Sequence, residues 1–188
     1  MKTIKILSIL FISVLSFSAC SSDDDLPQVI NEEEVITDVS LEITNAMGET
    51  TTYTFTDPQY RDETYVSPVI LLEENATYVV EARFYNKSNP NNPEDITVEI
   101  KEERNAHFVT YAFANATVDL ERTDGADATD SDGIPIGIST KWTTNSATSG
   151  DVVVRLIHEA EVKDITNPNG SVVGGETDVE AIFDLEIE

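Results

Sequence analysis

Apolar and polar residues alternate along most of this chain, and no segment shows a sustained apolar repeat of 3.6 residues. The alternation is clearest at Val39, Leu41 and Ile43 and returns in the stretch 50–56. A two-residue period places apolar side chains on one face of a β-strand, and the frequent β-branched residues favour the same structure. Strands with one apolar face bury it against a second sheet, so the pattern predicts an all-β fold.

We expect about nine strands in an antiparallel β-sandwich that spans residues 35–188, because Gly, Pro, Asn and Asp punctuate the alternating segments at short intervals. These strands come from ten candidate β segments, namely 35–44, 50–56, 69–72, 78–85, 95–101, 107–113, 116–121, 136–144, 151–157 and 179–187.

One tyrosine suggests the type of sandwich. Leu72 precedes Tyr78 by six residues, and Tyr78 opens an alternating strand. This spacing resembles the tyrosine corner of fibronectin type III and other immunoglobulin-like sandwiches, which implies a hydrogen bond between the phenol and the nearby backbone. The alternative is a tyrosine that simply favours a strand position.

The N-terminus has the organisation of a secretion signal. Lys2 and Lys5 precede an apolar run over 6–17, the small residues Ser18 and Ala19 follow, and then comes Cys20, the sole cysteine. The run is shorter than the roughly 20 residues that span a bilayer. We therefore expect a lipoprotein signal peptide over 1–19 and a lipid anchor on Cys20. The alternative is an ordinary signal peptide beside a chance cysteine.

Residues 20–34 read as an acidic tether. The run Ser22-Asp23-Asp24-Asp25 resembles the export tag that directs lipoproteins of Bacteroidetes to the cell surface. The resemblance implies an outer-membrane, lipid-anchored protein that is exposed at the surface, whereas the composition alone indicates a hydrated linker.

Charge narrows the choice of partners. The chain holds 36 acidic residues against 11 Lys and Arg, a net charge of −25. Such a field repels nucleic acid, so a nucleic-acid partner is excluded, and cations or cationic partners are compatible with it. Solubility alone also explains the acidity.

Motifs for catalysis are missing from the sequence. Neither histidine accompanies a Gly-x-Ser-x-Gly elbow, no cysteine is left after lipidation, and no glycine-rich phosphate loop is present. We therefore expect a protein that is not an enzyme.

Two groups of residues suggest metal binding. Asp124, Asp127, Asp130 and Asp132 surround a glycine turn with hard oxygen ligands of the kind that Ca²⁺ prefers, although their spacing excludes an EF-hand. The alternative is a solvated acidic turn.

The second group contains both histidines. His107 opens a predicted strand shortly after Glu103, and His158 closes another just before Glu159. Two imidazoles with a carboxylate suit Zn²⁺ and other divalent transition metals. The alternative is that each histidine is a surface or structural residue, since the sequence does not show that the two strands meet.

From His107 onward the chain resembles a group of small flavobacterial lipoproteins labelled as type 1 periplasmic binding fold superfamily proteins. The resemblance is carried by Glu102-Glu103 with His107-Phe108, by Asp132-Gly133-Ile134-Pro135-Ile136-Gly137, by 154–159 and by 174–180. It groups Glu176 and Asp178 with His158 as further carboxylate candidates. Where such proteins read Arg-His-Glu-Pro, this chain has Ile157-His158-Glu159-Ala160 and lacks the basic neighbour.

The label implies a larger two-lobed α/β protein, which conflicts with the absence of helical periodicity, so our expectation follows the residues. The resemblance further implies an accessory that captures or gates a small ligand for a TonB-dependent transporter, an outer-membrane β-barrel. Together with the histidines, this leads us to expect a non-enzymatic ligand- or metal-binding accessory. The alternative is a structural or adhesive surface module that uses aromatic loops such as 57–68.

Overall fold

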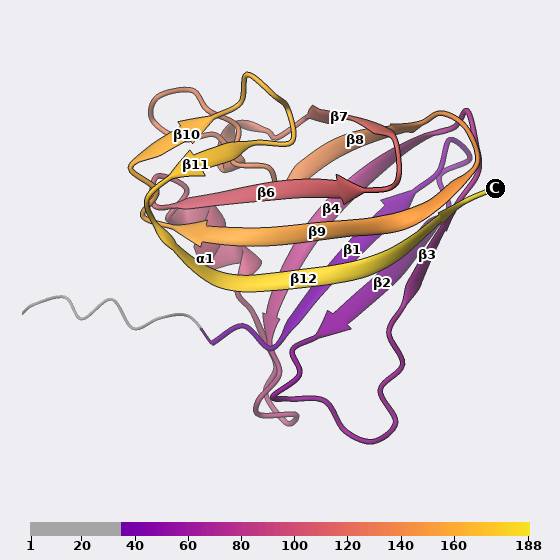
Figure 1. The fold of residues 1–188 in the computed structure, drawn as a ribbon. Coiled ribbons are helices and arrows are strands. Elements are labelled where there is room, and N and C mark those ends of the chain that lie inside the picture. The colour runs from indigo at the N-terminus through magenta and orange to yellow at the C-terminus, as the bar shows by residue number, and fades with distance from the viewer. Residues whose placement is uncertain (1–34) are drawn as a thin grey trace, which may run out of the picture. The chain divides into compact units, whose positions relative to one another are not determined.

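The computed structural model describes residues 35–188. The predicted signal peptide, Cys20 and the acidic tether lie outside the described residues. Figure 1 shows α1, β10 and β11 at one end of the domain and the C-terminus at the other. No helix in the described part has the length and apolar character needed to cross a bilayer.

The elements have the following bounds: β1 Asp38–Thr44, β2 Thr50–Thr56, β3 Val69–Leu72, β4 Thr77–Asn86, β5 Glu94–Asp95, α1 Thr97–Glu102, β6 His107–Ala114, β7 Val118–Arg122, β8 Ser139–Thr144, β9 Thr148–His158, β10 Val162–Asp164, β11 Ser171–Val173 and β12 Glu176–Ile187, with a short 3₁₀ turn at Ala126–Ala128.

The first sheet has the strand order β2-β1-β4-β8-β7, with β5 paired to the end of β4. All its pairs are antiparallel. Strands β4, β7 and β8 alternate between buried and more exposed positions, as in β4, where Tyr78, Val80, Ala82 and Phe84 are buried. The period of two that was expected from the sequence thus gives this sheet one apolar face.

The second sheet has the order β3-β12-β9-β6. The pairs of β12 with β9 and of β9 with β6 are antiparallel, whereas β3 runs parallel to β12. Between the long strands β9 and β12, the chain makes a separate small hairpin of β10 and β11. This hairpin lies directly beyond the ends of β9 and β12 that carry His158 and Asp178.

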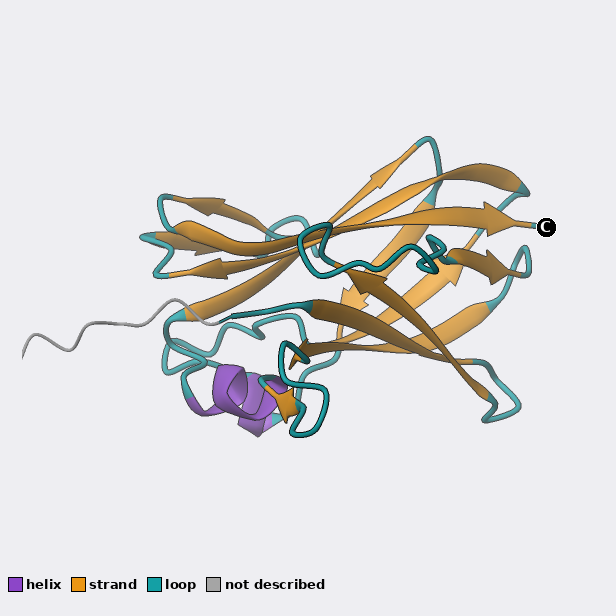
Figure 2. Cartoon of the chain, turned by 90° about the horizontal axis from the view of Figure 1, so that it is seen from below, coloured by secondary structure: helices purple, strands orange, loops and turns teal. Residues whose placement is uncertain are grey.

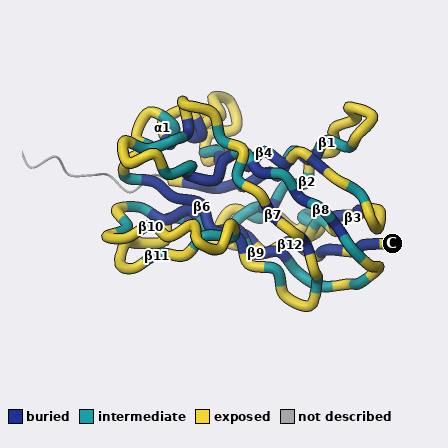
Figure 3. The backbone as a smooth tube through the Cα atoms, turned by 90° about the horizontal axis from the view of Figure 1, so that it is seen from above, coloured by how far each residue is buried: buried dark blue, intermediate teal, exposed yellow. Residues whose placement is uncertain are grey.

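One apolar core lies between the two sheets. Phe55 of β2 contacts Phe183 of β12 with ring centroids 6.2 Å apart, and Trp142 of β8 packs edge-on against Tyr111 and Phe113 of β6. Figures 2 and 3 show the strands in layers, with buried positions along the strands and exposed positions in the connecting loops. The expectation of a β-rich domain with antiparallel sheets is confirmed, and the two facing sheets give it a sandwich-like architecture.

The expected hydrogen bond at Tyr78 is present. The backbone N–H of Glu73 donates to the Tyr78 hydroxyl at 2.8 Å, while the ring is buried in the core. The bond ties the β3–β4 turn to the strand that follows it.

The predicted strand over 95–101 is wrong, because most of this segment forms the six-residue helix α1. Ile96, Val98 and Ile100 alternate as in a strand, but Ile96 and Ile100 are also four residues apart and share one helical face. The structure buries these two isoleucines and leaves Val98 exposed. Thr97 ties the first turn of α1 to β4, since its hydroxyl accepts a hydrogen bond from the Phe84 N–H.

The strand count also differs from the expected nine, because the described residues contain twelve strands. β5, β10 and β11 are only two or three residues long. Such segments are too short for a pattern of alternation to reveal.

Candidate metal centre

The pairing of β6 with β9 brings the two histidines together. His107 and His158 are direct register partners, although 51 positions separate them in the sequence. Their rings are stacked with centroids 4.8 Å apart and an angle of 9° between the planes. Because register partners point to the same side of a sheet, both imidazoles extend from the core face at the end of their strands.

A β-bulge in β12 supplies the carboxylate. Glu176 and Thr177 pair with His158 and Ile157, but the next register partner, of Leu156, is Val179. Asp178 is therefore the extra residue of the bulge and has no place in the ladder. A bulge redirects a side chain in this way, and here it brings Asp178 to the two histidines while Val179 keeps its buried place in the core.

His107, His158 and Asp178 each offer one ligand atom, and these atoms all lie within 4.8 Å of one another. Tetrahedral zinc with bonds of about 2.0–2.1 Å places its ligand atoms roughly 3.3 Å apart. A closure of at most about 1.5 Å, shared among the three side chains, would therefore bring the ligand atoms around an ion. No other group of three or more such residues within 35–188 is arranged to hold a metal.

The environment of His107 keeps its imidazole neutral. The side chain is fully buried, and this burial, together with the nearby His158 and Lys163, lowers the pKa of His107 to about 4. Neutral imidazole is the form that binds metals.

The tautomer also suits a ligand. The Nδ1 atom of His107 lies 3.2 Å from the carbonyl oxygen of Glu103, which can only accept a hydrogen bond. Nδ1 therefore carries the proton, and the lone pair of the ring is on Nε2. A histidine that donates one nitrogen to a backbone carbonyl and turns the other to a metal is a common arrangement in metal sites.

Tight backbone connections hold the strand ends in place. Glu159 has a positive φ of 51°, and its N–H donates to the Ala106 carbonyl at 2.8 Å. Gly175 has φ of 83°, and a Cβ there would lie 2.7 Å from the carbonyl oxygen of His158. Only glycine accommodates both the conformation and the close approach, so this residue lets β12 begin beside His158.

The other three predicted carboxylate candidates do not join the cluster. Glu103, Glu159 and Glu176 are all exposed. Glu103 acts instead through its backbone carbonyl, and Glu176, although it is the register partner of His158, is not among the three grouped residues. The structure brings together the two histidines that the sequence suggested, and the bulge places Asp178, of the neighbouring acids, beside them.

The four aspartates of the predicted calcium loop are not gathered into one site. Asp124 accepts hydrogen bonds from the backbone N–H groups of Gly137 and Ser139, and burial raises its pKa. Asp127 pairs with Lys101, and Asp130 pairs with Lys163. Asp132 is exposed. Three of the four carboxylates, those of Asp124, Asp127 and Asp130, are therefore engaged by different protein partners.

Lys163 is a residue near the site that the sequence did not reveal. Its ammonium donates to the Arg104 and Asn105 carbonyls just before His107 and lies 3.2 Å from the Asp130 carboxylate. Side-chain exposures of 7% for Lys163 and 5% for Asp130 make this a buried pair. It fastens β10 to the segment that leads into β6, and no spacing in the sequence marks it.

Comparison with family models, with curated proteins and with solved structures gave no match for this chain. We therefore infer the function from the residues themselves.

Proposed function

We propose that the domain binds a divalent transition metal ion through His107, His158 and Asp178. The single observation that carries this proposal is the meeting of the three side chains on adjacent strands, with ligand atoms within 4.8 Å. Two imidazole nitrogens and one carboxylate oxygen suit Zn²⁺ and its neighbours in the transition series, and they do not suit Ca²⁺ or Mg²⁺, which prefer oxygen alone.

The geometry favours a metal ion that is bound reversibly over one that only stabilises the fold. His158 and Asp178 are half-buried, whereas His107 is fully buried, so the cluster reaches the surface on one side. Three protein ligands leave a fourth tetrahedral position for water or an external group. An ion held in this way can be taken up from, and handed to, another molecule, which is the property required of a metal-handling accessory.

In the cell we place this domain on a surface lipoprotein of the outer membrane, anchored through Cys20 and acting without enzymatic activity beside a TonB-dependent transporter. The support is the signal-like N-terminus, the Ser-Asp-Asp-Asp run and the resemblance to flavobacterial lipoproteins. We also assign the sandwich to the immunoglobulin or fibronectin III type, on the hydrogen bond between Glu73 N–H and Tyr78.

The test is calorimetric titration of Zn²⁺, Cu²⁺ and Ca²⁺ into metal-stripped protein of residues 20–188, with Cys20→Ser so that no thiol competes. We expect saturable binding of one Zn²⁺ that is lost in the double variant His107→Ala, His158→Ala. Because His107 is buried, the single variant His158→Gln is measured as well, and circular dichroism checks that each protein is folded.

The matched control is the pair Glu103→Gln and Glu159→Gln, which removes two exposed carboxylates beside the histidines in sequence but outside the cluster. It should bind Zn²⁺ as the parent does. Absence of zinc binding in the parent, or equal binding in the double histidine variant, would refute the proposal.

One observation favours the adhesive module as a second candidate. In the loop 57–68, Tyr60 is 45% exposed and Val66 is 82% exposed. The Arg61 guanidinium lies over the rings of Phe55 and Tyr65, and Tyr60 and Val66 are the exposed large hydrophobic side chains of this loop. If zinc binding fails while Tyr60→Ser, Val66→Ser abolishes attachment of whole cells to a protein- or glycan-coated surface, the adhesive function is favoured.

A further inference from the structure

A pocket of about 680 Å³ lies at the other end of the domain from the histidines. It is bordered by the β1–β2 turn, the end of β3, the β3–β4 turn and Glu188 after β12. Asp178 and Glu188 are separated by ten residues of extended strand, a distance of roughly 30 Å. Small-molecule sites in proteins commonly have volumes of roughly 300–1,000 Å³, so this pocket is large enough for a ligand.

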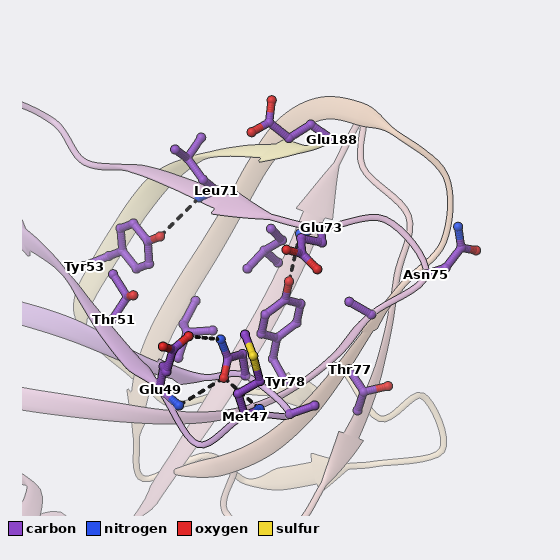
Figure 4. Close-up of a pocket in the computed structure, with 15 residues that line it drawn as sticks. Met47, Glu49, Thr51, Tyr53, Leu71, Glu73, Asn75, Thr77, Tyr78 and Glu188 are labelled. Carbon is purple, nitrogen blue, oxygen red and sulfur yellow. Dashed lines mark hydrogen bonds between the residues drawn. The ribbon is translucent and has the colours of Figure 1, made fainter.

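Figure 4 shows how side chains from different elements meet around this space. Tyr53 enters from β2 and Tyr78 from β4, while Met47 and Leu71 border the opening. Met47 is 79% exposed and Leu71 is 51% exposed, and both belong to the few large apolar side chains that reach solvent. Exposed apolar groups around a concavity commonly mark a binding site, and methionine adapts its shape to a ligand.

The walls of the pocket are already fixed. In the β1–β2 turn, the Asn45 side-chain oxygen accepts hydrogen bonds from the Met47 and Glu49 N–H groups. In the β3–β4 turn, the Thr144 hydroxyl donates to the Glu73 carbonyl, and the Tyr78 hydroxyl accepts from the Glu73 N–H. A ligand would therefore meet a formed site and would not have to order these turns, which favours affinity.

The charged side chains that line the pocket are all acidic. They are Glu49, Glu73 and Glu188, and no lysine, arginine or histidine of the described chain lines it. Within residues 35–188, no hydrogen bond or ion pair engages the carboxylates of Glu73 and Glu188, whereas Glu49 accepts one from the Asn45 amide. The pocket thus combines the half-buried ring of Tyr53, aliphatic groups and carboxylates that no basic side chain of the lining neutralises.

We propose that this pocket binds a small organic ammonium ion with an apolar body. A protonated amine is attracted by the carboxylates and by the half-buried ring of Tyr53, and the apolar body displaces water from Met47, Leu71 and that ring. A neutral molecule would gain only the last of these contributions, and an anion would be repelled by the three carboxylates and by the net charge of −25.

The test is a ¹H–¹⁵N NMR titration of residues 20–188 carrying Cys20→Ser, with phenethylammonium as the probe and EDTA present. A ligand this small should bind with a Kd on the order of 1 mM. The amide shifts should be largest in the segments 45–49 and 71–78. Its neutral counterpart, 2-phenylethanol, should bind at least about fivefold more weakly, since it lacks the charge that the carboxylates recognise.

Two variants localise the interaction. Glu49→Gln, Glu73→Gln should weaken phenethylammonium binding at least about fivefold, because it removes two of the three lining carboxylates. The control Glu63→Gln, Asp184→Asn removes the same charge at exposed positions that do not line the pocket, and it should bind as the parent does.

Shifts spread over the whole acidic surface, equal binding of 2-phenylethanol, or an unchanged Kd in Glu49→Gln, Glu73→Gln would each overturn the proposal. The outcome does not depend on the metal site, because the titration is done without metal and the two sites share no residue.

Discussion

The two ends of the sandwich assemble their polar groups in different ways. At the histidine end, His107, His158 and Asp178 come from three adjacent strands and meet through the register of the second sheet. At the pocket end, the polar groups come from turns and are held by local hydrogen bonds, such as those accepted by Asn45.

This difference has a chemical consequence. The histidine end buries a neutral imidazole next to groups that can coordinate a metal, and it exposes little of His107 to water. The pocket end leaves its carboxylates exposed beside a rim of apolar groups. Strand register therefore forms a compact site for an ion, and turn chemistry forms an open site for a larger ligand.

The largest effect should be a loss of Zn²⁺ affinity when Asp178, but not its neighbour Glu176, is substituted. Asp178→Asn should weaken Zn²⁺ binding by about 100-fold or more, since even residues that only support a metal ligand typically contribute 10- to 100-fold. Glu176→Gln should change the affinity by less than about threefold, because Glu176 is exposed and outside the cluster. Competition with a chromogenic zinc chelator measures both.

Equal losses in these two variants would mean that general negative charge, and not the bulge at Asp178, attracts the ion.

The next effect is a dependence of stability on pH in metal-free protein. The folded state holds the pKa of His107 at about 4, below its usual value of 6.5. The unfolded chain therefore binds the proton first as pH falls, so the free energy of unfolding should decrease between pH 6.5 and pH 4 by up to about 3 kcal/mol.

Urea denaturation at several pH values measures this decrease, with His107→Gln as the reference because glutamine does not titrate. The difference between the two proteins should shrink or change sign across this window as pH falls. Parallel profiles would contradict the burial of a neutral His107.

A smaller effect is expected at the pocket end. Tyr78→Phe leaves the Glu73 N–H without its partner and should lower the free energy of unfolding by about 1–2 kcal/mol. Tyr53→Phe should cost only about 0.5 kcal/mol, since the Leu71 N–H reaches that hydroxyl at a long 3.4 Å. Both variants should bind Zn²⁺ as the parent does, and a loss of zinc affinity in either would couple the two ends.

Calcium should have the smallest effect. Asp124 and Asp130 are engaged with backbone N–H groups and with Lys163, so the aspartates of 124–132 have little capacity left for an ion. Addition of Ca²⁺ after EDTA should move the melting temperature by less than about 1 °C, because a ligand stabilises only in proportion to its occupancy of the folded state. A shift of several degrees would restore the calcium loop as a site.

The sequence predicted the sheets well where alternation is long and poorly where segments are short. The segments 50–56 and 69–72 match β2 and β3 in their bounds, whereas 95–101 satisfies both the strand and the helix period. The hydroxyl of Thr97 and the core beneath Ile100 decide between them, and these depend on contacts with β4 that a local pattern cannot show.

The candidate site was predictable in part. Acidic neighbours at strand ends indicated His107 and His158, but their pairing depends on the register of β6 and β9. Asp178 could be named only beside Glu176, because a bulge of one residue has no sequence signal of its own. The pocket went unnoticed because its lining comes from turns and strand ends that are distant in the sequence.

The most direct test of the metal site is anomalous diffraction at the zinc edge from crystals of the zinc-loaded protein. We expect one strong peak about 2.0–2.2 Å from an imidazole nitrogen of His107, an imidazole nitrogen of His158 and a carboxylate oxygen of Asp178. Zinc bound only to exposed carboxylates elsewhere, with the two imidazoles still stacked at 4.8 Å, would contradict it.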